Sequence, residues 1–245
     1  MQKMEPPDQF HLIAHRGGLY YRPQNSMAAF EFILNRGIEW IETDIRLSSD
    51  GVPVLFHDER IHVPGAGLHQ VRELSCSELQ SIDIGGGELL PTLGELFDRF
   101  SDRFYYDFDI KDPDAVDVVV PIIRRYELAE RSVLSSFIPD ALQRALEIAP
   151  EIHRGLLLDN LTGRLVDGRH AVNAARLLEC EYFLPHHRIL KPEWVETAGS
   201  EGLKVIAWTV NQLADAQRML NMGVDGLISD RPDYLRGLVK EDRVA

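Results

Sequence analysis

Short apolar runs alternate with amphipathic stretches along most of this 245-residue chain. The runs have the length of β-strands and are rich in β-branched or aromatic side chains. Most of the stretches between them place apolar residues at helical spacing, as in SMAAFEFILNRG, PDALQRALEIAP and QLADAQRMLNMG. The strand-like runs are HLIAH (11–15), WIETDI (40–45), RFYYDFDIK (103–111), SVLSSF (132–137), RGLLLD (154–159), EYFLPH (181–186), KVIAWTV (204–210) and VDGLISD (224–230).

Alternation of strands and helices predicts a parallel sheet. Eight strands in a chain of this length predict a TIM-type (β/α)8 barrel. A ninth run, PVLFH (53–57), breaks the alternation because only a short turn at Asp50 and Gly51 separates it from the strand before. Asp-Gly between apolar runs is a strong hairpin signal, so we expect an extra antiparallel strand. If Asp50 and Gly51 are the two central residues of the turn, Asp44 stands opposite His57.

The segment 58–92 follows this extra strand and departs from the strand-and-helix pattern. It contains the glycine-rich stretches HVPGAGLH and SIDIGGGELLP. Neither matches the GxxxxGK phosphate-binding loop, so the glycines indicate turns. We therefore expect one barrel domain over residues 1–245, with a small insertion near the active site at 58–92.

Composition and charge narrow the class of protein. The formal net charge is −13, which argues against nucleic-acid binding through a broad basic surface. The two cysteines are far apart and form no CxxC pair, which fits a reducing compartment. The first residues, MQKMEPPDQF, lack the apolar core of a signal peptide, and no apolar run is long enough for a membrane span. We expect a cytoplasmic protein that binds a small molecule; the pattern leaves its oligomeric state open.

Acidic side chains gather at the ends of two predicted strands. Glu42 and Asp44 lie on the second strand, while Asp107 and Asp109 lie on the third barrel strand. Barrel enzymes hold their active sites at the C-terminal ends of strands, and residues two apart on a strand point to the same side. Three carboxylates that converge on one cavity repel each other unless a cation lies among them. Oxygen ligands alone favour Mg²⁺ or Ca²⁺ over zinc.

Basic and titratable side chains occupy the neighbouring strand ends. His15 and Arg16 follow the first strand, His57 ends the extra strand, and Lys111 follows Asp109 by two positions. A histidine can take up or release a proton near neutral pH, while Arg and Lys stabilise negative charge. Each residue alone is a weak signal, but the set is what an active site requires.

The order of these elements resembles the glycerophosphodiester phosphodiesterase family. The resemblance spans almost the whole chain. It implies a TIM barrel that hydrolyses glycerophosphodiesters to glycerol 3-phosphate and an alcohol, with a divalent cation. The matching elements are HRG (15–17), PQNSMAAF (23–30), IETDIRLSSDGVPVLFHD (41–58), PTLGEL (91–96), FDIK (108–111), SSF (135–137), AWTVN (207–211) and VDGLISDRPD (224–233).

The resemblance also implies roles for individual residues. It makes His15 and His57 the general acid and base without saying which is which. Trp208 is expected to pack beside the substrate. The implied metal ligands are Glu42, Asp44 and Asp109, and the implied phosphate-binding residues are Arg16 and Lys111.

Two positions depart from the family pattern. The first loop reads PQNS where the family has PENT or PEHT, so Gln24 replaces a carboxylate. The third ligand is Asp109 where the family usually has Glu. Two alternatives stay open: a phosphodiesterase of the same scaffold acting on a lysophospholipid or a sugar phosphodiester, and a catalytically silent barrel that binds a phosphodiester or a partner protein. The 58–92 insertion separates the substrate classes, because it is expected to line the pocket and is short, which favours a small or open substrate site.

Overall fold

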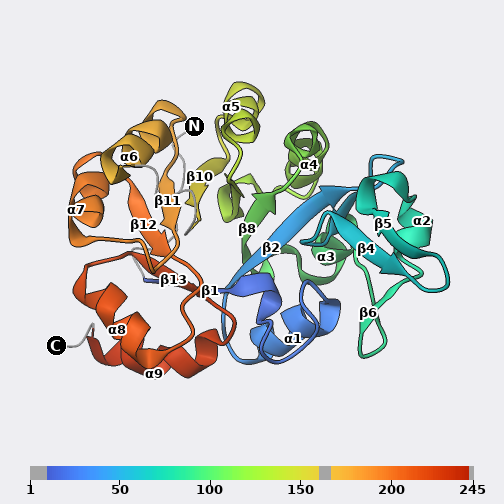
Figure 1. Ribbon diagram of the computed structural model, residues 1–245, viewed down its shortest axis with the longest axis horizontal. Helices are drawn as coiled ribbons and strands as arrows, with labels where there is room; N and C mark the ends of the chain where they lie inside the picture. Colours follow the sequence, from blue (N-terminus) through green and yellow to red (C-terminus); the bar gives the residue numbers. More distant parts are fainter. Residues whose placement is uncertain (1–9, 160–166, 243–245) are drawn as a thin grey trace.

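The computed structural model describes residues 10–159 and 167–242, and its central element is a closed barrel (Figure 1). The main sheet has the strand order β1-β13-β12-β11-β10-β9-β8-β2-β3, and a further pairing of β1 with β2 closes it. All barrel pairings are parallel, which confirms the predicted fold. The barrel strands are β1 (His11–Ala14), β2 (Trp40–Leu47), β8 (Tyr105–Ile110), β9 (Ser132–Ser136), β10 (His153–Leu158), β11 (Tyr182–Pro185), β12 (Lys204–Ala207) and β13 (Gly226–Ser229).

Helices surround the strands (Figure 1). In α3, for example, Leu93, Leu96 and Phe97 are buried, and a capping box between Thr92 and Glu95 fixes the first turn. No helix in the described ranges is both long and apolar enough to cross a bilayer. The larger helices are α1 (Met27–Asn35), α3 (Leu93–Phe100), α4 (Val116–Arg125), α5 (Pro139–Ile148), α6 (Gly168–Leu177), α7 (Pro192–Ser200), α8 (Leu213–Asn221) and α9 (Pro232–Asp242).

The extra strand β3 (Pro53–Leu55) pairs antiparallel with β2, as predicted, but the predicted register is wrong by one residue. Arg46 stands opposite Val54, and the amide of Phe56 donates to the carbonyl of Asp44 over 3.1 Å. The loop has three residues rather than two, because the Ser48 amide donates to the Val52 carbonyl over 3.1 Å. Gly51 closes the loop at φ 75°, the left-handed position of such a hairpin. His57 follows the end of the paired ladder instead of facing Asp44 across it.

Residues 58–92 form two small hairpins and a short helix beside the barrel, near α3 (Figure 1). Buried apolar side chains from this insertion and from β3 form a separate small core that anchors it. The elements are β4 (Arg60–Val63), β5 (Gly67–Gln70), α2 (Cys76–Leu79), β6 (Asp83–Gly85) and β7 (Glu88–Leu89). The core residues are Val54, Ile61, Val71, Leu79, Ile82 and Leu90.

A packed apolar layer fills the barrel interior. It closes the space below the strand ends, so that inward-facing polar side chains of β2 and β8 stand at the C-terminal face. The layer consists of Ile13, Trp40, Val133, Leu157, Tyr182, Leu184, Ile206 and Ile228.

Candidate active site

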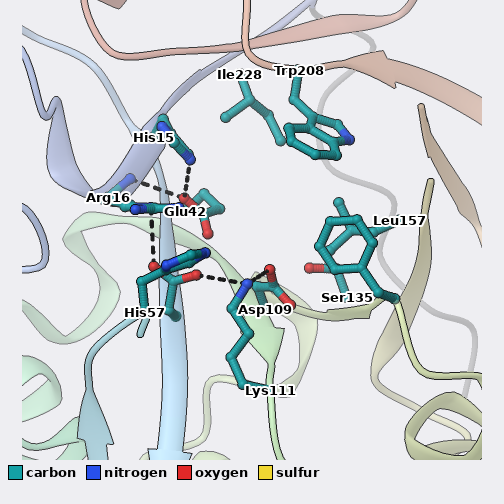
Figure 2. A pocket seen from close by; sticks show the side chains of 12 residues that line it. His15, Arg16, Glu42, His57, Asp109, Lys111, Ser135, Leu157, Trp208 and Ile228 are labelled. Atoms are coloured by element: carbon teal, nitrogen blue, oxygen red, sulfur yellow. Dashed lines mark hydrogen bonds and ion pairs between the residues drawn. The ribbon is translucent and has the colours of Figure 1, made fainter. Parts of the chain in front are cut away.

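A pocket opens among the C-terminal ends of the barrel strands (Figure 2). Its wall contains every site residue that the sequence predicted. Trp208 and Ile228 lie across the pocket from Lys111, so one side is apolar and the other is charged (Figure 2). The lining residues are His15, Arg16, Glu42, Asp44, His57, Asp109, Lys111, Ser135, Phe137, Leu157, Trp208 and Ile228.

Three carboxylates converge in this pocket. The pairing of β2 with β8 puts Asp44 beside Asp109, and Glu42 shares their side of the sheet. One oxygen from each residue lies within 4.8 Å of the others, and all three residues are buried. Oδ1 of Asp109 is buried and has no hydrogen-bond partner among the described residues. A buried oxygen without a partner and an all-oxygen donor set fit a hard divalent cation such as Mg²⁺ or Ca²⁺.

The three carboxylates differ in pKa because their surroundings differ. Burial, with the nearby charge of Asp44, raises the pKa of Glu42 to about 8. Burial also raises the pKa of Asp109 to about 6. Burial acts on Asp44 too, but the neighbouring charges of Lys111 and Arg16 outweigh it and hold the pKa of Asp44 below its ordinary value. Protons therefore occupy part of this cluster near neutral pH and compete with any cation for it.

The loop after β1 positions Arg16 over the acidic cluster. Its amide donates to Oε2 of Glu42 over 2.9 Å, and its Nε lies 3.2 Å from Oδ2 of Asp44. Nη1 donates to Oε1 of Gln24 over 2.6 Å. Gln24 thus keeps the orienting contact even though it lacks the family's negative charge. The neighbouring Asn25 is buried, and its amide nitrogen donates to Asp44 over 2.9 Å.

This loop has a strained backbone that only a tight fit supports. Arg16 has φ 50°, in the left-handed region, where residues with a Cβ are uncommon. Gly17 follows at φ 78°, and a Cβ there would lie 2.8 Å from the ring of Phe30. The two glycines after Arg16 therefore let the chain turn sharply against α1. The turn brings both the amide and the side chain of Arg16 onto the carboxylates.

His15 lies between two carboxylates, those of Asp230 and Glu42. Its Nδ1 lies 2.6 Å from Oδ1 of Asp230, while its Nε2 lies 3.9 Å from Oε2 of Glu42 (Figure 2). Asn211 Nδ2 donates to Oδ2 of Asp230 over 2.6 Å. Burial opposes the charge on Asp230, but the hydrogen bond with His15 lowers its pKa below the ordinary value. Asp230 is therefore ionised and accepts a hydrogen bond from Nδ1 of His15, which leaves Nε2 facing the pocket.

His57 reaches the pocket from the end of the extra strand. Its Nδ1 lies 2.7 Å from Oδ1 of Asp58, and its side chain is 36% exposed. Arg46 Nε donates to the His57 carbonyl over 2.9 Å, which fixes the backbone beyond the paired ladder. Burial lowers the pKa of His57 below its ordinary value, although the charge of Asp44 and the hydrogen bond with Asp58 act in the opposite direction. The His57 imidazole is thus neutral near neutral pH.

Lys111 bridges two of the carboxylates. Its ammonium lies 3.0 Å from Oδ1 of Asp44 and forms an ion pair with Asp109. Across the pocket, the indole nitrogen of Trp208 donates to the Leu184 carbonyl over 2.8 Å. The rings of Phe137 and Trp208 meet edge to face with centroids 5.5 Å apart. This bond and this contact fix the apolar side of the pocket.

Several residues that complete the site were not predicted from the sequence. Asp230 directly follows β13, and Asn211 lies in the loop after β12, so their place beyond the strand ends is the signal that could have found them. Asp107 lies one layer below Asp109; burial raises its pKa to about 7, although the contact with the Ser135 hydroxyl acts in the opposite direction. Ser135 stands beside Asp109 on β9, and its hydroxyl is buried.

Comparison with known proteins points in one direction. Residues 15–234 match the model of the glycerophosphoryl diester phosphodiesterase family. A protein of Caldanaerobacter subterraneus named glycerophosphodiester phosphodiesterase is 32% identical over 94% of this chain and 98% of its own length. The crystal structure of a protein from Silicibacter pomeroyi matches this chain with a TM-score of 0.87 and 27% sequence identity. The match covers 97% of this chain and 95% of the Silicibacter pomeroyi chain. An Oleispira antarctica phosphodiesterase, solved with the product sn-glycerol-3-phosphate, has a TM-score of 0.80 at 25% identity over 95% of this chain and 96% of its own.

Proposed function

The chain belongs to the glycerophosphoryl diester phosphodiesterase family, and from this premise we propose that it hydrolyses glycerophosphodiesters to glycerol 3-phosphate and an alcohol with the help of a divalent cation. One observation carries the proposal: three buried carboxylates, two histidines and two fixed cations line a single pocket. The product bound to the Oleispira antarctica phosphodiesterase supports glycerol 3-phosphate as the product released here.

Glu42, Asp44 and Asp109 would hold the cation, Mg²⁺ or Ca²⁺. When bound, the cation supplies positive charge to the non-bridging phosphate oxygens, on which negative charge grows in the transition state. Gln24 and Asn25 contribute indirectly, because they orient Arg16 and Asp44.

Arg16 and Lys111 bind the phosphate group. Both already lie at the carboxylates, with Nε and Nζ 3.2 Å and 3.0 Å from the two oxygens of Asp44. Three carboxylates, a divalent cation, two fixed cations and one singly charged phosphodiester balance to zero net charge. A neutral assembly of this kind is what a partly buried site can stabilise.

His15 and His57 transfer the protons. One removes the proton of the attacking hydroxyl, which belongs either to water or to the glycerol portion of the substrate. The other donates a proton to the oxygen of the departing alcohol. Asp230 keeps Nε2 of His15 turned toward the reacting atoms and stabilises the imidazolium when it forms. Trp208 and Phe137 pack against the carbon atoms of the glycerol portion.

The test is direct. Purified protein is incubated with a panel of glycerophosphodiesters and, separately, with a lysophospholipid, in the presence of Mg²⁺, Ca²⁺ or a chelator. We expect release of glycerol 3-phosphate from the glycerophosphodiesters whenever a suitable cation is present. Binding of the diesters without any release would instead indicate the silent barrel.

A further inference from the structure

A second cavity, of about 330 Å³, adjoins the active site. Lys111 lines both spaces, so the two meet at this residue. The insertion supplies Glu59, Gln70 and Arg72 to the wall of this cavity. Arg46 of β2 and Asp112 after β8 complete it on the barrel side. Nearly the whole wall is charged or polar.

Every cation in this wall already has a carboxylate partner. Arg46 Nη1 lies 3.2 Å from Oδ1 of Asp112, whose other oxygen accepts from the Leu47 amide over 3.1 Å. Arg72 forms an ion pair with Asp114. Lys111 pairs with the carboxylates of the active site. These positive charges are neutralised locally, so they give the cavity little attraction for an anion.

Glu59 differs from its neighbours. Its carboxylate makes no hydrogen bond or ion pair with any described residue, and the side chain is exposed to the cavity and to solvent. Only its backbone is engaged, through the bond from the Val71 amide to the Glu59 carbonyl at 3.0 Å. The cavity therefore carries one negative charge without a partner.

We propose that this cavity binds the alcohol portion of the phosphodiester and that Glu59 favours alcohols that carry an amino group. This inference rests on the proposed function. A phosphate bound at Lys111 has two arms: the glycerol arm lies against the apolar side at Phe137 and Trp208, and the other arm extends past Lys111 into the polar cavity. A charged wall of this size suits a compact polar alcohol and penalises the acyl chain of a lysophospholipid.

The experiment compares three glycerophosphodiesters whose alcohols are ethanolamine, glycerol and methanol. The readout is kcat/KM for release of glycerol 3-phosphate at fixed cation and salt. We expect the ethanolamine diester to be preferred over the glycerol diester, and Glu59→Gln to lower that preference about two- to fivefold, the scale of one solvent-screened charge pair. Glu73→Gln removes a carboxylate from the same insertion outside the cavity and should leave the preference unchanged.

A second variant tests whether the alcohol portion binds in this cavity, apart from the effect of the Glu59 charge. Gln70→Trp narrows the cavity and should reduce kcat/KM for the ethanolamine and glycerol diesters, while the methyl diester, whose alcohol is too small to enter, reports the intact site. The inference is overturned if Glu59→Gln keeps the wild-type preference for the ethanolamine diester over the glycerol diester. It is also overturned if Gln70→Trp, with a wild-type melting temperature, changes kcat/KM equally for all three diesters. If the wild-type protein cleaves none of the three, the proposed function itself fails.

Discussion

Nδ1 of His15 lies 2.6 Å from Oδ1 of Asp230, 215 residues later in the chain. The contact depends on closure of the barrel, because β1 pairs in parallel with β13 and sets Ala14 beside Ser229. His15 directly follows β1, and Asp230 directly follows β13. The carboxylate after the last strand of the barrel therefore positions the imidazole after the first strand. Folding of the complete barrel is thus a condition for an oriented His15.

Replacement of Asp230 by Asn tests this relationship. The neutral amide can present an N–H to His15, which favours the tautomer with its proton on Nε2 and weakens the imidazolium. We expect kcat/KM to fall about 10- to 100-fold, the usual cost of losing such a supporting contact, with the fold unchanged by circular dichroism. Asp233→Asn is the matched control, because Asp233 pairs with Arg36 and Tyr21 outside the pocket. Equal activity of the two variants would remove Asp230 from the site.

Loss of either pocket histidine should reduce activity more than Asp230→Asn does. His15→Ala and His57→Ala are each expected to lower turnover by about 10²–10⁴-fold, as for loss of a general acid or base. His62, His69 and His170 lie outside the pocket and should tolerate the same change. Steady-state kinetics on one glycerophosphodiester provide the measurement. Near-normal turnover in His15→Ala or His57→Ala excludes that residue from proton transfer.

Cation affinity should rise with pH. Glu42, with its pKa raised to about 8, and Asp109, with its pKa raised to about 6, must lose their protons before they can bind a cation. We expect affinity to increase from about pH 5 to pH 8 and then to level off. Calorimetry in buffers of different ionisation enthalpy measures both the affinity and the protons released. Affinity that stays constant across this range, with no proton release, contradicts the assignment of these ligands.

Two buried acids, Glu42 and Asp107, should make the metal-free protein less stable as pH rises. Glu42 and Asp107 have pKa values of about 8 and about 7 in the folded state, above those of an unfolded chain. At a pH between the pKa of the unfolded chain and the raised pKa of the folded state, the folded state binds more protons than the unfolded state. The free energy of unfolding therefore falls as pH rises from the first pKa to the second. Denaturant titrations with a chelator should show this fall, and Asp107→Asn should reduce its slope. A slope identical to that of the wild type would show that Asp107 does not contribute.

Much of the fold and site could be predicted from sequence, because the signals are local. The strands are short apolar runs, and Glu42, Asp44, Asp109 and Lys111 sit at fixed two-residue spacing on two of them. The hairpin register could not be predicted reliably. Asp50 and Gly51 fit a two-residue turn as well as a three-residue loop, and the choice depends on bonds from Ser48 to Val52 that a pattern does not reveal.

The roles of the supporting residues could not be predicted for a different reason. Asp230 and Asn211 act only through contacts with His15 and with each other, and those contacts exist only after the barrel closes. The charge state of the cluster also depends on tertiary structure. Burial rather than residue type raises the pKa of Glu42 while Lys111 and Arg16 lower that of Asp44, and sequence spacing carries no measure of burial.

The central claim is that Glu42, Asp44 and Asp109 hold a divalent cation that hydrolysis requires, and titration of activity with Mg²⁺ or Ca²⁺ tests it most directly. Glycerol 3-phosphate release is measured for the wild type, Asp109→Asn and Asp109→Glu after complete removal of metal. We predict no activity without a cation, a rise of at least about tenfold in the cation concentration that Asp109→Asn needs, and a milder shift for Asp109→Glu, which keeps the charge. Full activity in metal-free wild-type protein, or one common titration curve for all three proteins, would contradict the claim.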